Sequence, residues 1–197
     1  MIGAGSLGSE VALLLAKTGV GSITLVDPEL LDYPNVGRHM LGVTQVRTFK
    51  ATSMAEKLAA DFPHMRSIKH FAEDWQSLYR KRPEVFHDTD LIVSTVGSWI
   101  AEGRLNQVVR SEVDFPPVIY GWAEPFSVAG HAVLIGSNGP CFACGMDHLG
   151  KALQTVCEWN TETTRTAPLW GQLSTIWAGI VVRRSGFGGA SLWPSRE

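Results

Sequence analysis

The sequence predicts an α/β fold with a doubly wound, mostly parallel sheet and antiparallel strands after the switch point of that sheet. Three observations lead to this prediction. Short apolar runs typical of strands alternate with segments whose apolar residues recur at helical spacing. A Gly-x-Gly-x-x-Gly motif at residues 3–8 opens the first helical segment. Residues 118–135 hold two strand-like runs with no helix between them, which favours antiparallel pairing there.

The individual elements follow from apolar spacing and from end signals. Apolar residues recur at helical spacing from Leu7 to Thr18, and residues 23–26 form an apolar strand that ends at Asp27. Thr44 can cap a second helix that runs to residue 61. The remaining expected elements are strands at residues 68–71, 91–95, 118–122 and 128–135 and helices at residues 75–81, 100–110 and 173–184.

The composition excludes several classes of protein. Of 197 residues, 45% are hydrophobic and 18% are charged, which supplies a core and excludes a disordered chain. The net charge of −2 gives no basic field for nucleic acid. No apolar run approaches the ~18 residues of a membrane span. Three cysteines form no disulfide framework, and the N-terminus lacks the basic region of a signal peptide, so we expect a reducing, cytoplasmic setting.

The domain organisation is simple. We expect residues 1–184 to form one domain, and residues 185–197, which are rich in Gly and Ser, to form a loose C-terminal tail.

The glycine motif predicts a Rossmann-like phosphate-binding loop. Gly3 permits a tight turn, Gly5 lets the backbone approach a phosphate, and Gly8 lets the helix pack on its strand. Backbone N–H groups at the start of the helix then face the anion. Asp27 ends the next strand, about twenty residues on, where a carboxylate binds ribose hydroxyls. The alternative is a glycine turn that only joins packed elements.

The loop after Asp27 bears on which nucleotide binds. A dinucleotide dehydrogenase needs little from this loop, and an NAD-dependent oxidoreductase is one hypothesis. Arg38 and Lys50, however, are two cations near the phosphate loop, and they suit a triphosphate better than a pyrophosphate bridge. Lys50 lies between Val46 and Met54 on the apolar side of its helix, so a lysine that only snorkels to solvent is an open alternative.

In order and spacing, these residues resemble the ThiF/MoeB/ubiquitin-activating-enzyme superfamily, and the bacterial ThiF-type adenylyltransferases most closely. The resemblance covers residues 1–184, and its specific part is Asn35-x-x-Arg38 together with Lys50. The stretches that carry it are Gly3-x-Gly5-x-x-Gly8, Leu25-Val26-Asp27, Asn35-x-x-Arg38, Gly37-Arg38-His39-x-Leu41-Gly42, Lys50-Ala51 and Pro140-Cys141-x-x-Cys144.

The resemblance implies that the protein uses ATP to adenylate the C-terminal carboxylate of a ubiquitin-like or sulfur-carrier protein that ends in glycine. It implies that Lys50 contacts the α-phosphate and that Arg38 contacts the β- and γ-phosphates. It assigns Asn35 to phosphate or to the metal-bound nucleotide, and Asp27 to the ribose. ATP and Mg²⁺ are the implied cofactors, and a homodimer is the implied assembly.

The sequence departs from the family pattern after the strand at residues 91–95. Where the family has an aspartate that helps to hold Mg²⁺, this chain has Gly97, and the next acidic residue is Glu102. Three hypotheses are open. ATP phosphates and water hold the metal, or Glu102 turns inward to reach it, or the chain is a non-catalytic ATP-binding adaptor for a ubiquitin-like protein.

The cysteines suggest a metal site of which only half is evident. Cys141 and Cys144 have the spacing of two zinc ligands, whereas the family's usual second pair is missing. By residue type, His148 and Cys157 could supply the other two ligands of a Cys₃His site. The alternative is that Cys141 and Cys144 are two unligated, buried cysteines. Cys157 is also a candidate nucleophile for thioester chemistry.

The start of the sequence is short for a fold of this class. A phosphate loop follows a strand, and in a doubly wound sheet that strand is central. Met1 and Ile2 precede the loop here, whereas a typical strand has ~5 residues. We therefore expect a truncated first strand and a chain that is a fragment of a longer ThiF-type protein, inactive by itself.

Overall fold

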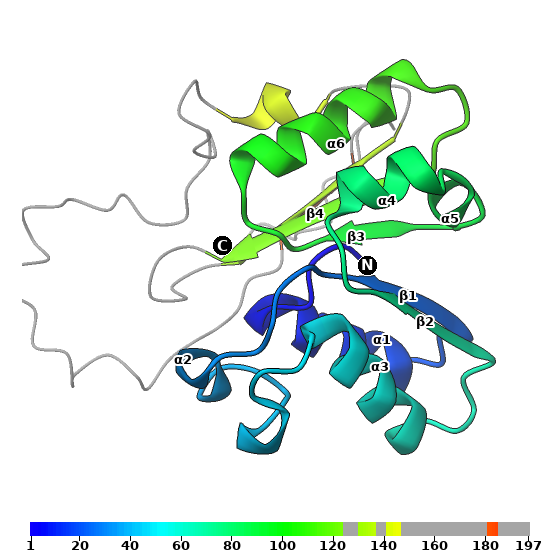
Figure 1. Cartoon of the computed structure of the whole chain (residues 1–197). Coiled ribbons are helices and arrows are strands. Elements are labelled where there is room, and N and C mark those ends of the chain that lie inside the picture. Colours follow the sequence, from blue (N-terminus) through cyan, green and yellow to red (C-terminus); the bar gives the residue numbers. More distant parts are fainter. Residues whose placement is uncertain (124–129, 137–140, 147–180, 185–197) are drawn as a thin grey trace, which may run out of the picture.

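The computed structural model describes residues 1–123, 130–136, 141–146 and 181–184, and within them it shows an α/β architecture (Figure 1). The strands are β1 (Ser22–Val26), β2 (Ser67–Phe71), β3 (Ile92–Ser94), β4 (Val118–Ala123), β5 (Gly130–Ile135) and β6 (Val181–Arg184). The helices are α1 (Ser6–Lys17), α2 (Tyr33–Val36), η1 (Val43–Gln45), α3 (Lys50–Asp61), α4 (Trp75–Lys81), α5 (Glu84–His87), α6 (Trp99–Ser111) and η3 (Phe142–Gly145).

The strand pairing is mostly parallel. β1 pairs with β2 in parallel, and β3 pairs with β4 in parallel. β4 and β5 follow each other without a helix and pair antiparallel, with Tyr120 opposite Val133. β6 then pairs with β5 in parallel. The predicted mixture of parallel strands and a later antiparallel pair is confirmed.

Met1 and Ile2 join the two groups of strands. Ile2 forms isolated parallel bridges with both Val26 and Ser94. Its N–H donates to the carbonyl of Val93 at 2.8 Å, and the N–H of Val26 donates to the carbonyl of Met1 at 2.9 Å. The order across the sheet is therefore β2, β1, residues 1–2, β3, β4, β5, β6. These two residues lie at the centre, as expected for the strand before a phosphate loop.

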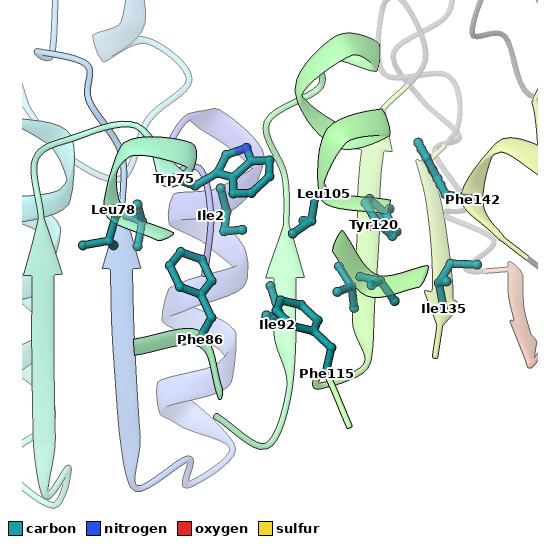
Figure 2. Packing of buried hydrophobic residues seen from close by; sticks show 13 residues of the cluster. Ile2, Trp75, Leu78, Phe86, Ile92, Leu105, Phe115, Tyr120, Ile135 and Phe142 are labelled. Carbon is teal, nitrogen blue, oxygen red and sulfur yellow. The ribbon is translucent and has the colours of Figure 1, made fainter. Parts of the chain in front are cut away.

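Helices cover both faces of the sheet, and each face has its own apolar cluster (Figure 1). Side chains of β1 divide between the clusters, because alternate residues of a strand point to opposite faces. The α1/α3 cluster contains Ala4, Ala12, Ala16, Ile23, Leu25, Leu31, Leu41, Ala51, Met54, Ala55 and Leu58. The α4/α6 cluster, drawn in Figure 2, contains Ile2, Val26, Trp75, Leu78, Phe86, Ile92, Leu105, Val109, Phe115, Val118, Tyr120, Ile135 and Phe142.

The predicted helix from Thr44 to residue 61 was wrong at its start. Thr44 lies in the short η1, and α3 begins only at Lys50, without a side-chain cap. Between them Arg47 has a φ of 70°, and its N–H donates to the carbonyl of Leu31 at 2.8 Å. Backbone pairing with the segment after β1 therefore interrupts the helix, and it leaves Lys50 in the first turn of α3.

The predicted helix at residues 173–184 was also wrong where the structure describes it. Val181–Arg184 form β6, in register with His131–Leu134 of β5. The β-branched pair Val181 and Val182 suits a strand, and an adjacent edge was available to pair with. The rest of that predicted helix, His148, Cys157 and the predicted tail at residues 185–197 lie outside the described residues.

Among the described residues, no helix combines the length and the apolar character that crossing a membrane requires.

The central position of Ile2 predicts a large stability cost on truncation. Ile2 is 3% exposed, whereas Ile100 on α6 is 68% exposed. We expect Ile2→Ala to lower the free energy of unfolding by about 2–5 kcal/mol, because it leaves a cavity in the α4/α6 cluster. The matched control Ile100→Ala should change it by less than about 0.5 kcal/mol. Urea unfolding measures both, and similar losses in the two variants would contradict the central role of Ile2.

Candidate functional site

The phosphate loop connects Ile2 at the sheet centre to α1. Gly3 has a φ of 90°, which favours glycine, and Thr95 from the end of β3 packs against it and donates its hydroxyl to the Gly3 carbonyl at 3.0 Å. A side chain at Gly8 would overlap the carbonyl of Gly3, so the helix packs on the loop as the motif predicts. Gly5 is the N-cap of α1, and a Cβ there would meet no atom within 4 Å. The loop is thus tightly packed at Gly3 and Gly8 and open at Gly5.

Asp27 anchors this loop to the end of β1. One oxygen of its carboxylate accepts the N–H of Ala4 at 2.6 Å, and the other accepts the N–H of Glu29 at 2.8 Å. The side chain is buried, with 5% of the residue exposed. Both carboxylate oxygens therefore accept hydrogen bonds from backbone N–H groups. These bonds fix the conformation of the loop, independently of any further contact that Asp27 makes. Its contact with ribose stays a prediction.

Lys50 projects from the first turn of α3 and forms an ion pair with Glu29. The Lys50 side chain is 6% exposed and that of Glu29 is 67% exposed. The ammonium is therefore enclosed and paired, and it does not snorkel to solvent as one interpretation of the sequence had it. Glu29 was not among the predicted site residues, and its only signal was its position two residues after Asp27.

Asn35 and Arg38 lie on the segment between β1 and α3. Asn35 is the third residue of the one-turn helix α2, and its side-chain oxygen accepts the N–H of Asp32 at 3.2 Å. This contact leaves the Asn35 amide N–H groups to donate elsewhere. Arg38 follows on the same segment and is exposed, with its N–H donating to the carbonyl of Asn35 at 3.0 Å.

His39 links this segment to the phosphate loop. Its Nδ1 accepts the N–H of Leu41 at 3.1 Å, so Nε2 carries the proton and donates to the carbonyl of Ala4 at 2.6 Å. Burial lowers the pKa of His39, which favours this neutral form. His39 belongs to the Gly37-Arg38-His39-x-Leu41-Gly42 stretch, and its position there gives no sign of this role. Both backbone groups of Ala4 are thus held, its N–H by Asp27 and its carbonyl by His39.

The Gly97 corner, formed by Ser94, Gly97 and Glu102, holds an inward-facing carboxylate. Gly97 has a φ of 65°, and Glu102 from α6 turns inward to it. One oxygen of Glu102 accepts the hydroxyl of Ser94 at 3.2 Å and the N–H of Gly97 at 3.4 Å. Burial raises the pKa of Glu102. The described residues contain no group of three or more His, Cys, Asp or Glu that could hold a metal ion.

Cys141 and Cys144 lie close together at η3, away from the phosphate loop. Their sulfur atoms are 3.1 Å apart, and Cys144 is exposed. The alternative of two buried cysteines is therefore wrong. The contact with the Cys144 sulfur lowers the pKa of the Cys141 thiol. The other two groups proposed for zinc, His148 and Cys157, are not among the described residues.

The sequence of this chain is also similar to those of known proteins. The chain matches the ThiF family over residues 1–183. It is 27% identical over 158 residues to an adenylyltransferase and sulfurtransferase uba4 of Aspergillus clavatus, covering 73% of this chain and 30% of the relative. It is 30% identical over 158 residues to the Nedd8-activating enzyme E1 catalytic subunit of Drosophila melanogaster, covering 75% of this chain and 34% of the relative. The chain thus spans less than half the length of these relatives.

The fold also has counterparts among solved structures. The crystal structure of E. coli MccB with ATP superimposes with a TM-score of 0.58 at 20% identity, covering 75% of this chain and 43% of MccB. At this identity the likeness concerns the fold alone.

The packing of the loop predicts different effects at two of its glycines. Gly8→Ala should lower the free energy of unfolding by about 1–3 kcal/mol, because the methyl group overlaps the Gly3 carbonyl. Gly5→Ala should change it by no more than about 1 kcal/mol, yet weaken ATP binding by about tenfold, or 1.4 kcal/mol, because it blocks a close approach of phosphate. Thermal unfolding and calorimetric ATP titration measure these effects. Equal stability losses would contradict the packing, and unchanged ATP affinity in Gly5→Ala would contradict the phosphate contact.

The raised pKa of Glu102 predicts a pH-dependent stability. The folded state holds the Glu102 proton more tightly than the unfolded state does. Its stabilising contribution is therefore complete below the ordinary glutamate pKa of about 4.3 and is lost as pH rises through the raised value. Glu102→Gln keeps an oxygen for Ser94 and Gly97 and removes the charge. We expect the variant to match the parent at low pH and to become the more stable of the two as pH rises. Urea unfolding checks this at one pH below the ordinary glutamate pKa and at one pH well above it. The control is Glu56→Gln, because Glu56 is exposed.

Proposed function

The chain belongs to the ThiF family, and on this premise we propose that it uses ATP to adenylate the C-terminal carboxylate of a ubiquitin-like or sulfur-carrier protein. The two relatives named above are an adenylyltransferase and a Nedd8-activating subunit by name. The loop, the two cations and the Asn35 amide supply the groups that such a reaction needs around a triphosphate.

The enclosed ammonium of Lys50 is the observation that carries the proposal. A buried cation is costly unless it is paired, and Lys50 has Glu29 as its partner. The Glu29 carboxylate is mostly exposed, so a phosphate oxygen can replace it beside Lys50 with little rearrangement. The cation is then in position before the reaction begins, which is the condition for effective electrostatic stabilisation. Lys50 also acts electrostatically on His39, which contacts the phosphate loop.

The proposed step is a displacement at the α-phosphorus of ATP. A carboxylate oxygen of the carrier forms a bond to the α-phosphorus, and the bond from that phosphorus to the oxygen bridging to the β-phosphate breaks. Pyrophosphate leaves with the electron pair. Lys50 would neutralise charge on the α-phosphate, Arg38 would neutralise charge on the departing phosphates, and the Asn35 amide would donate to a phosphate oxygen.

Magnesium enters this proposal only with the nucleotide. The Glu102 carboxylate lies at the Gly97 corner, and the remaining ligands of Mg²⁺ would be phosphate oxygens and water.

The decisive experiment is ATP–pyrophosphate exchange by the complete gene product, in the presence of a carrier protein that ends in Gly-Gly. We expect carrier-dependent exchange, and we expect Lys50→Ala and Arg38→Ala each to lower it by about 10²-fold or more. Lys57→Ala is the matched control, because Lys57 lies on the same helix and pairs with Asp61 at the surface. Thermal unfolding of each variant separates a lost charge from a lost fold. Exchange that survives both substitutions would contradict the assigned roles.

A second candidate function follows from the Gly97 corner. A chain that binds ATP and a carrier without activating the carrier would be an adaptor, and the absence of an acid at Gly97 favours it. A Cβ at Gly97 would meet no atom within 4 Å, and aspartate tolerates the backbone angle found there. Tight ATP binding without exchange, in both the parent and Gly97→Asp, would support the adaptor. Exchange gained in Gly97→Asp would instead indicate an enzyme that lacks one acid.

The NAD-dependent alternative makes a different prediction in the same samples. It requires that NAD bind more tightly than ATP, and it leaves Arg38 and Lys50 without a function. A competition titration distinguishes the two nucleotides.

A further inference from the structure

Glu29 has a fixed backbone and an exposed carboxylate beside Lys50. Its N–H donates to the Asp27 carboxylate at 2.8 Å, and its carbonyl accepts the N–H of Lys50 at 2.9 Å. Next to these contacts, Leu30 and Phe49 form an antiparallel bridge. The Glu29 side chain, by contrast, is 67% exposed. The ion pair with Lys50 can therefore open through rotation of the Glu29 side chain, while the backbone stays in place.

The Lys50 ammonium lies near the phosphate loop and needs an anion beside it. Burial lowers the pKa of His39, and the positive charge of Lys50 lowers it further. His39 in turn contacts the loop, where its Nε2 donates to the carbonyl of Ala4 at 2.6 Å. Only 6% of the Lys50 side chain is exposed, and an enclosed ammonium is costly unless it is paired. Glu29 supplies the anion that Lys50 needs.

Asp27, the carboxylate that follows β1, is held in a different way. One of its oxygens accepts the N–H of Ala4 at 2.6 Å, the other accepts the N–H of Glu29 at 2.8 Å, and the residue is 5% exposed. Moving the Asp27 carboxylate would break two hydrogen bonds that hold the backbone near the phosphate loop. Moving the Glu29 carboxylate opens one ion pair. Of these two carboxylates, Glu29 is therefore the one that can give way to a phosphate.

We propose that Glu29 is a counter-ion of Lys50 that competes with the nucleotide and thereby weakens ATP binding, an inference that rests on the proposed function. A phosphate at Lys50 and the Glu29 carboxylate are like charges beside one ammonium, so they repel each other. Before ATP binds, Glu29 compensates the enclosed charge. When a phosphate arrives, the carboxylate turns into solvent, and it returns when the nucleotide leaves. Glu29 thus sets the affinity for the nucleotide and takes no part in the transfer of the adenylyl group.

Calorimetric titration of the complete gene product with ATP and Mg²⁺ tests this proposal. Glu29→Gln keeps the size of the side chain and removes its charge, so we expect ATP to bind about fivefold more tightly. Glu29→Asp keeps the charge but shortens the side chain and weakens the ion pair, so we expect a smaller gain in affinity. Asp61→Asn is the matched control, because Asp61 pairs with Lys57 at the other end of α3. It should change ATP affinity by less than about twofold.

A second background separates competition for Lys50 from a general loss of negative charge. Lys50→Met keeps the apolar stem and removes the cation, and we expect it to weaken ATP binding by about tenfold or more. In this background Glu29→Gln should change the affinity by less than about twofold, because the two residues act on ATP through their shared contact. An equal gain in both backgrounds would overturn the proposal in favour of direct repulsion between Glu29 and ATP.

The remaining outcomes distinguish this inference from the proposed function. If Lys50→Met weakens ATP binding and Glu29→Gln leaves it unchanged or weaker, Glu29 does not compete with the nucleotide, and the proposed adenylation stands. If neither the parent protein nor Glu29→Gln binds ATP, both the inference and the proposed function are contradicted. Thermal unfolding of each variant without ATP shows whether it is folded, and Glu29→Asp keeps the test available if Glu29→Gln is not.

Discussion

The backbone hydrogen bonds of Met1 and Ile2 are the constraint on which the rest of the structure depends. They bridge β1 and β3, and without them the described strands would form two separate groups. Because Gly3 follows directly, the same bonds place the phosphate loop at the strand ends, between the two halves of the sheet. Ile2 also lies within the α4/α6 cluster, so the position of the loop and the packing of the core are determined together.

The candidate site is built mainly by groups that hold one another. The N–H of Ala4 is held by Asp27 and its carbonyl by His39, and Thr95 holds the carbonyl of Gly3. Such contacts do not touch a substrate, but they remove conformational freedom from the loop before a phosphate arrives. The charged groups differ in this respect. The Lys50 side chain is enclosed, whereas its partner Glu29 is exposed, and Arg38 is exposed as well.

Much of the fold could be predicted because its elements alternate in a regular way. The alternation of strands and helices, the mostly parallel pairing and the later antiparallel pair all followed from apolar runs and the lengths between them. The errors arose where a segment pairs with a distant one. The apolar spacing after Thr44 is helical, but Arg47 bonds to Leu31 and delays α3 to Lys50. Residues 181–184 have apolar neighbours compatible with a helix, but β5 offers an edge that pairs with them.

For the site, the sequence by itself determined which residues are candidates and their chemical type: the glycines of the loop, the acid after β1, and the two cations Arg38 and Lys50. Only the tertiary structure decided what each of them holds. In the folded chain both oxygens of Asp27 accept backbone N–H groups, and Lys50 pairs with Glu29. Glu102 turns toward Gly97 and Ser94. The physical reason is how far apart in the sequence the interacting residues lie. Glycine conformation and residue spacing are local properties, whereas hydrogen bonds and burial depend on residues that the sheet brings together from distant parts of the chain.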